Sequence, residues 1–111
     1  MADVLGVFGQ AVLLAVVRLR DEAYGRAILK EVQARLERDV APGEVHATLE
    51  RLEAKGLLTS RLGSGTPVRA GRARRYYRLQ PAGIRALNDA RAAAETMWRG
   101  VAWPLPVRRS C

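Results

Sequence analysis

The residues of this chain that could do chemistry are mainly arginines, and they gather in one short stretch. Residues 59–79 hold six arginines and no acid, and so supply +6 of the formal net charge of +8. This stretch follows a helix-like segment, and nucleic acid is the partner that it favours, because each phosphate neutralised by a basic side chain releases condensed counterions. The alternative is a solvated charge run without a partner. The six arginines are Arg61, Arg69, Arg72, Arg74, Arg75 and Arg78.

The other chemically reactive residue types are too sparse for catalysis. The chain has one histidine, His46, and one cysteine, Cys111, and no acid pair, glycine-rich phosphate loop or metal-ligand cluster at useful spacing. We therefore expect neither an enzyme nor a cofactor or metal site. The lone cysteine offers no internal disulfide, and the longest apolar run, residues 11–17, is far short of the roughly 20 residues that span a bilayer. These features predict a cytoplasmic protein that is not inserted in a membrane.

The elements that must position the arginines begin with three helices. Apolar residues on nearly every side predict a helix over residues 5–19 that needs covering all round, and a partner subunit would provide it through Leu5, Phe8 and Val12. A four-residue apolar spacing predicts a second helix over residues 24–36. The third is predicted over residues 42–55, with Pro42 in its first turn, Gly56 at its end and a core stripe of Val45, Leu49 and Leu52.

A hairpin and a last helix follow. We expect strands over residues 57–62 and 72–79 with a turn over residues 63–71, and alternation puts Tyr77 and Leu79 on one face and Tyr76 and Arg78 on the other. Pro81 opens a helix that we expect to run to about Val101, because Pro104 and Pro106 forbid further helix.

The last helix has a near-heptad seam with small residues in its middle, which is typical of a helix that packs closely against another. We interpret it as a dimerisation arm. The alternative is a helix that folds back onto its own domain. The residues expected at this part of the dimer interface are Leu87, Ala94, Trp98 and Val101.

Three helices and a basic hairpin define a winged helix-turn-helix, so the predicted fold class is mainly α with a small β-hairpin and a long C-terminal helix. We expect a DNA-binding domain over residues 1–80, a dimerisation helix over 81–103 and a short tail over 104–111. In such a module the third helix enters the major groove, and the wing either follows the backbone or reaches into the minor groove. The third-helix residues expected to face away from the core and contact DNA are Glu44, His46, Ala47, Thr48, Arg51 and Lys55.

The order of these segments resembles the PadR family of bacterial transcriptional regulators over about residues 6–87. The resemblance is carried by residues 13–19, Tyr24-Gly25, residues 43–57 with Thr48-Leu49, Arg51-Leu52-Glu53 and Gly56-Leu57, and residues 74–79 with Gly83. The length, with one C-terminal helix, is similar to that of the family's small subfamily. The resemblance implies a homodimeric winged-helix protein that binds promoter palindromes, usually as a repressor, and that is often relieved by small molecules or stress signals.

Carried over by position, the resemblance assigns Tyr24 to a phosphate contact and Arg72, Arg74 and Arg75 to the wing. Two positions depart from the family pattern. His46 stands where tyrosine is usual, and it is either a mildly pH-sensitive DNA contact or a plain helix-surface histidine. Gln80 stands where threonine is usual and should cap the last helix less well.

Trp98 has two interpretations at the expected subunit seam. It is either hydrophobic packing between subunits or a stacking surface for a planar small-molecule effector. Two other classes of function also stay open at this point, a winged helix that binds only proteins and one that binds RNA. The acid-free arginine hairpin argues against the first, and the shortage of exposed aromatic residues, with Tyr76 the only candidate, argues against the second.

Overall fold

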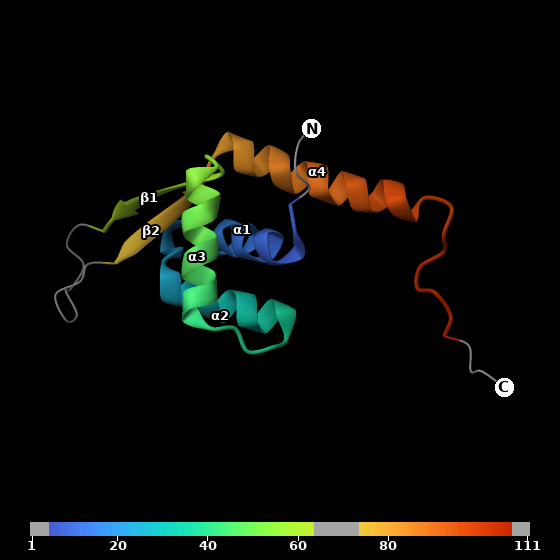
Figure 1. The fold of residues 1–111 in the computed structure, drawn as a ribbon, viewed down its shortest axis with the longest axis horizontal. Coiled ribbons are helices and arrows are strands. Elements are labelled where there is room, and N and C mark those ends of the chain that lie inside the picture. The colour runs from blue at the N-terminus through green and yellow to red at the C-terminus, as the bar shows by residue number, and fades with distance from the viewer. Residues whose placement is uncertain (1–4, 64–73, 108–111) are drawn as a thin grey trace.

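The computed structural model describes residues 5–63 and 74–107 of the 111. Its elements in chain order are α1 (Val7–Leu19), a 3-10 turn η1 (Arg20–Glu22), α2 (Gly25–Leu36), α3 (Pro42–Ala54), β1 (Leu58–Leu62), β2 (Arg75–Leu79) and α4 (Pro81–Trp98). Figure 1 shows α1, α2 and α3 packed together, with the hairpin and α4 leaving this group in opposite directions. This is the predicted winged helix-turn-helix with a long C-terminal helix.

The hydrophobic core lies where the three helices meet the base of the hairpin. Val45, Leu49 and Leu52 of α3 are each no more than 2% exposed, so the predicted core stripe is confirmed. Ile28 and Val32 bring the inner face of α2 into the same cluster. Burying these branched side chains stabilises the domain by roughly 1.5 to 3 kcal/mol each.

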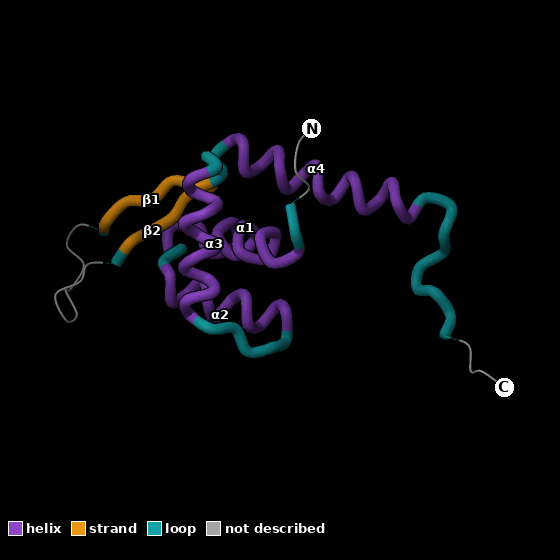
Figure 2. Tube along the Cα trace, in the orientation of Figure 1, coloured by secondary structure: helices purple, strands orange, loops and turns teal. Residues whose placement is uncertain are grey.

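The two strands pair antiparallel, with Leu58 opposite Leu79 and Leu62 opposite Arg75. Figure 2 shows them as a narrow ribbon beside α3. Tyr77 is buried and Arg78 is exposed, so the predicted alternation of faces is confirmed. Most of the predicted turn, together with Arg69 and Arg72, lies outside the described residues.

Helix α1 differs from the prediction that a partner must cover most of it. Val12 is completely buried inside its own domain, because α1 is the central helix and packs against α2, α3 and β2. Its assignment to the dimer interface is therefore wrong. A narrower apolar stripe on α1 stays uncovered, formed by Val7, Leu14 and Val17, which are 71%, 38% and 46% exposed.

Helix α4 starts at Pro81, and Gln80 occupies the N-cap without a side-chain hydrogen bond, in agreement with the weak cap expected there. The helix stops at Trp98 rather than near Val101, because Gly100 takes a left-handed backbone (φ 84°) that ends it before the prolines do. Val101 therefore lies beyond the helix and not on its seam.

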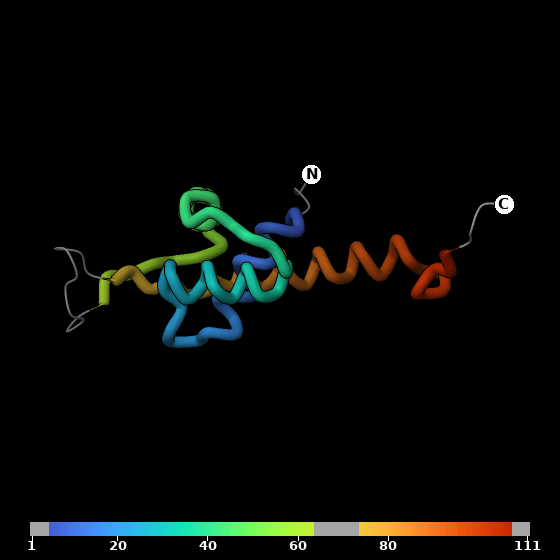
Figure 3. The backbone as a smooth tube through the Cα atoms, turned by 90° about the horizontal axis from the view of Figure 1, so that it is seen from below, coloured from blue at the N-terminus to red at the C-terminus, as the bar shows by residue number. Residues whose placement is uncertain are grey.

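Only the first half of α4 packs against the domain. Gly83 and Ala90 are buried and Leu87 is partly buried, whereas every residue of the helix after Ala90 except Ala93 is exposed. Figure 3 shows this second half projecting past the helical group. Helix α4 therefore docks on its own domain at one end and is left uncovered at the other.

Candidate nucleic-acid interface

The exposed side of α3 is narrower than the sequence suggested. Thr48 is only 3% exposed, so the expectation that it faces outward is wrong. It lies three residues after Val45 and four before Leu52, and at 3.6 residues per turn this places it on the edge of the buried stripe. Its small side chain fits there without leaving a buried polar atom unpaired among the described residues.

The part of α3 that points straight away from the core carries small side chains and one acid. Helical geometry places Gly43, Ala47, Glu50 and Ala54 opposite the buried stripe, and all four are exposed. We call these four residues the outer strip of α3. Glu50 was not assigned to the site from the sequence. Its position four residues after His46 places both side chains on the same side of the helix and could have indicated that Glu50 belongs to the exposed surface. The carboxylate of Glu50 lies 3.7 Å from His46 Nε2, with both side chains more than two-thirds exposed.

One flank of the outer strip is a groove between α2 and α3, about 850 Å³ in volume. Basic side chains line it from three elements: Arg26 and Lys30 from α2, His46 from α3 and Arg75 from β2. Arg26 and Lys30 were not assigned from the sequence, because on an amphipathic helix they look like ordinary solvent-exposed charges. Their approach to the wing becomes visible only in the folded chain.

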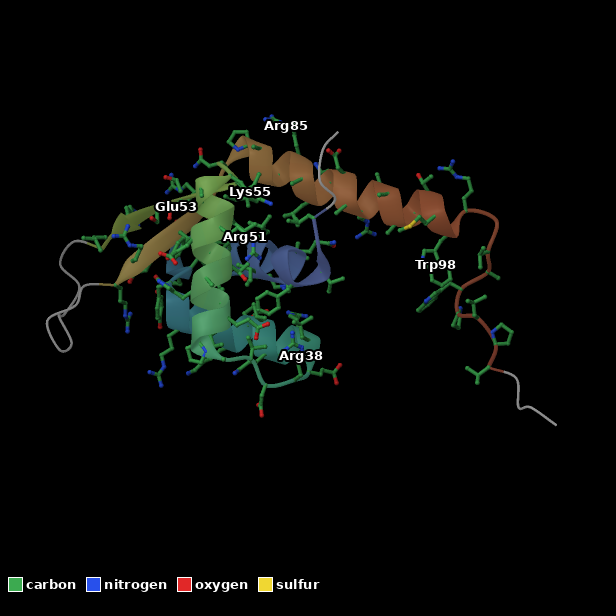
Figure 4. The ribbon with its side chains drawn as sticks, in the orientation of Figure 1. Arg38, Arg51, Glu53, Lys55, Arg85 and Trp98 are labelled. Carbon is green, nitrogen blue, oxygen red and sulfur yellow. The ribbon has the colours of Figure 1, made fainter. Side chains whose placement is uncertain are left out.

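The other flank carries Arg51 and Lys55. Figure 4 shows both on the side of α3 that faces α1 and α4, with Arg85 of α4 beyond them. All three line a second groove, whose floor is apolar and includes Phe8 and Leu52. The sequence-predicted DNA contacts of α3 thus divide between two sides of the helix, with the small outer strip between them.

The N-terminal end of α3 is held by a neighbouring loop residue. Glu44 lies 3.8 Å from the guanidinium of Arg38, a pair in which both side chains are about half exposed. Arg38 also stacks over the Phe8 ring, with 5.7 Å to the ring centroid. Glu44, which was expected to contact DNA, is therefore partly neutralised by Arg38.

The wing is fastened to the start of α2 by a row of alternating rings and guanidinium groups. Arg74 lies 4.2 Å above the centroid of the Tyr24 ring, Tyr24 meets Tyr76 edge to face at 5.7 Å, and Arg61 lies 5.2 Å from the Tyr76 centroid. The backbones are linked as well, because Tyr77 N–H donates to the carbonyl of Ala23 at 2.8 Å. Tyr24 and Arg74, which the sequence placed in separate elements, are therefore neighbours.

Hydrogen bonds also tie the wing to α3. The Ser60 hydroxyl donates to Glu53 Oε2 at 2.7 Å, and Arg75 Nη1 donates to the same hydroxyl at 3.0 Å. A side-chain hydrogen bond with Tyr76 raises the pKa of Arg74 above its ordinary value, so this guanidinium stays charged. Arg74 and Arg75 are both exposed and available to an anion, while Arg72 lies outside the described residues.

The residues expected at the dimer interface are brought together only in part. Leu5, Phe8 and Leu87 are partly buried against their own core, whereas Ala94 and Trp98 lie on the uncovered half of α4. Trp98 is 42% exposed and sits at the far end of the helix (Figure 4).

Within residues 5–63 and 74–107, no three side chains of the metal-binding types come together in a way that could hold an ion. None of the helices in that part of the chain has the length and apolar content needed to cross a membrane.

A basic wing held against a three-helix group, with an exposed third helix between two basic flanks, defines the chain as a winged helix-turn-helix protein. Residues 13–89 match the family model described as the transcriptional regulator PadR-like family. The chain belongs to this family, which makes it a DNA-binding transcriptional regulator and not an enzyme, as predicted.

Individual relatives agree with this assignment. The chain is 43% identical over 81 residues to the transcriptional regulator Rv3488 of Mycobacterium tuberculosis, a match that covers 73% of this chain and 71% of the relative. A PadR family regulator from Eggerthella lenta superposes with a TM-score of 0.63 at 31% identity, over 84% of this chain and 79% of that one. A PadR family regulator from Clostridium difficile R20291 gives a TM-score of 0.61 at 25% identity, over 85% and 88% of the two chains.

Proposed function

We propose that this regulator is a homodimeric repressor that binds a palindromic promoter site by inserting α3 into the major groove. The observation that supports this most directly is the arrangement of α3, in which a strip of small residues points outward between two basic flanks. A major groove about 12 Å wide admits one helix and is bounded by two phosphate backbones. The outer strip would meet the base edges while each flank meets one backbone.

The side chains of the outer strip suit base contacts. The Ala47 methyl group is small enough to touch a thymine methyl, and the Glu50 carboxylate can accept a hydrogen bond from the amino group of cytosine. His46, beside Glu50, is the third residue that we assign to base contacts. Thr48 leaves the set of proposed DNA contacts because it is buried.

The basic flanks and the wing suit phosphate contacts. On one side these would come from Tyr24, Arg74 and Arg75, and on the other from Arg51 and Lys55. Contacts of this kind fix the register of the protein on the duplex and supply affinity that is sensitive to salt. Arg72 is proposed for the same role from the resemblance alone, and Glu44 is proposed to position Arg38 at the start of α3.

The uncovered half of α4 supports the homodimer. In this half Trp98 is 42% exposed, and the small side chain of Ala94 leaves room for a close neighbour. Ile84, on the same side in the first turn of the helix, is 49% exposed. The apolar stripe on α1 formed by Val7, Leu14 and Val17 is uncovered too. A second copy of the chain can bury both surfaces by packing its own α4 across them.

Repression then follows from steric exclusion. A two-fold dimer presents its two α3 helices to successive major grooves about one helical turn apart, and a promoter held in this way is closed to polymerase.

Trp98 would lie at the subunit seam in this dimer. Of the two interpretations that the sequence left open for it, one is hydrophobic packing between subunits and the other predicts a stacking surface for a planar effector. Titration with planar dyes while following tryptophan fluorescence tests that prediction. Quenching that saturates, and that is lost in a Trp98→Leu variant, supports an effector site. Absence of quenching at high micromolar dye leaves Trp98 as a packing residue.

The DNA-binding proposal is tested by the salt dependence of operator binding. Arg74→Gln removes one phosphate contact from each subunit, so the slope of log K against log salt should fall by about 2 in a dimer. Arg35→Gln is the matched control, because Arg35 lies on the opposite side of α2 from Arg26 and pairs with Glu31 at 2.9 Å. An unchanged slope in the Arg74 variant would mean that the wing does not clamp phosphate.

A further inference from the structure

The outer face of the hairpin carries a small pocket next to the row of rings and guanidinium groups that fastens the wing to α2. It has a volume of about 200 Å³ and lies where the strands meet the turn between α1 and α2. We call it the corner pocket. The residues that matter to its chemistry are Arg20, Asp21, Thr59, Arg61, Tyr76 and Arg78.

Strand pairing brings two of its arginines together. Thr59 lies opposite Arg78 and Arg61 lies opposite Tyr76. The Ser60–Tyr77 pair lies between these two pairs, so their four side chains share the face of the hairpin that points away from the core. Arg61 is restrained further, because its guanidinium lies over the Tyr76 ring. Two guanidinium groups and a hydroxyl are therefore presented side by side on a rigid surface.

The third arginine comes from a different element. Arg20 begins the η1 turn with a φ of 51°, in the left-handed region that residues other than glycine seldom adopt. The turn places Arg20 at the edge of the pocket, next to the strands.

The residues that line the corner pocket carry an excess of positive charge. Three guanidinium groups stand against one carboxylate, that of Asp21, which leaves a local charge of +2. Within the described residues, none of Arg20, Arg61 and Arg78 forms an ion pair within 4.0 Å. A concave site with this excess of guanidinium groups suits a phosphate, which arginine binds through paired hydrogen bonds. The volume is below the roughly 300 Å³ at which drug-sized ligands begin.

We propose that the corner pocket binds a phosphate group through Arg20, Arg61 and Arg78, with Thr59 as a hydroxyl donor. The phosphate has two sources with the same chemistry. It is either a backbone phosphate of DNA flanking the operator, in which case the inference rests on the proposed function, or a free phosphorylated small molecule.

The first arm of the test uses the protein alone and inorganic phosphate as the probe. The Nε–Hε signals of the arginine side chains are followed by NMR while phosphate replaces chloride at constant ionic strength. We expect saturable shifts confined to Arg20, Arg61 and Arg78, and about tenfold weaker binding in the double variant Arg20→Gln, Arg78→Gln. Arg35→Gln is the control and should bind phosphate as the unmodified chain does. A melting curve for each variant verifies that the fold is kept.

The second arm measures binding to an operator duplex and to the same duplex lengthened at both ends. If the phosphate belongs to DNA, lengthening raises the affinity of the unmodified chain but not that of the double variant. The titration with free phosphate tests the corner pocket without any DNA. A failure of the phosphate-binding proposal is therefore distinguishable from a failure of the proposed DNA-binding function. The proposal is overturned by two results together. Free phosphate would give only shifts that do not saturate and that Arg35 also shows, and lengthening the duplex would raise the affinity of the unmodified chain and of the double variant equally.

Discussion

Replacing Gly83 with alanine tests how the direction of α4 is set. A Cβ at this position would lie 2.4 Å from the carbonyl oxygen of Leu57 and 2.8 Å from Leu79 Cδ1. Such contacts essentially never fall below 3.0 Å, so α4 or the Leu57 backbone must shift by several tenths of an ångström. The same Leu57 oxygen accepts a hydrogen bond of 2.9 Å from Gln80 N–H, and the shift would strain that bond too.

The expected cost follows from two opposing terms. Overpacking against a backbone atom costs about 1 to 3 kcal/mol, and the better helix propensity of alanine returns about 0.5 to 1 kcal/mol. We expect a net loss of roughly 1 to 2 kcal/mol, which lowers the melting temperature of a domain this size by several degrees. The displaced base of α4 should also weaken the dimer, because the helix carries the proposed seam.

The assay is thermal unfolding of Gly83→Ala beside Gly43→Ala. Gly43 lies in the first turn of α3 with nothing within 4 Å of its added Cβ, so that variant should be as stable as the parent or slightly more stable. If Gly83→Ala is no less stable than the Gly43 variant, the close approach of Gly83 to Leu57 does not anchor α4.

Three other predictions concern the wing, the core and the dimer. Tyr24→Phe keeps the ring that packs on Arg74 and Tyr76 but loses the hydroxyl, so operator affinity should fall about 5- to 10-fold with unchanged thermal stability; equal affinity would remove Tyr24 from the phosphate contacts. Burial raises the pKa of Tyr77 above 10, so the folded state holds this proton more tightly than the unfolded state. The stability that this provides is present below pH 10 and is lost as the pH rises through the folded-state pKa. The loss in free energy of unfolding should be smaller in Tyr77→Phe, which urea unfolding between pH 8 and 11 would measure. Leu14→Glu places a charge in the exposed stripe of α1 and should give a folded monomer in sedimentation, whereas a stable dimer would exclude this stripe from the interface.

The helices, the hairpin and the core were predictable from sequence because their signals are local. The spacing of Val45, Leu49 and Leu52 requires only the helical repeat, and Gly56 at the end of α3 takes the left-handed backbone (φ 78°) that the sequence suggested. The stop at Gly100 was missed because the prolines beyond it are the stronger signal. The glycine nevertheless comes first in the chain and so decides where the helix ends.

The details of the candidate site were less predictable because they depend on packing between elements. Thr48 was expected to face outward because threonine is polar, yet the buried stripe of α3 is wider than its three aliphatic residues. Val12 was assigned to a partner because α1 is apolar on most sides, yet the domain itself covers it. The contact of Arg74 with Tyr24 joins residues fifty positions apart, which no local pattern reveals.

The central claim is that two copies of α3 and the wing read a duplex site. Selection of bound duplexes from a random pool tests it most directly, followed by a comparison of the winning duplex with single-stranded RNA. We predict a two-fold palindrome with half-sites about one helical turn apart, and changed base preference in an Ala47 or Glu50 variant. Recovery of no common sequence, or tighter and salt-sensitive binding to the RNA, would contradict the account.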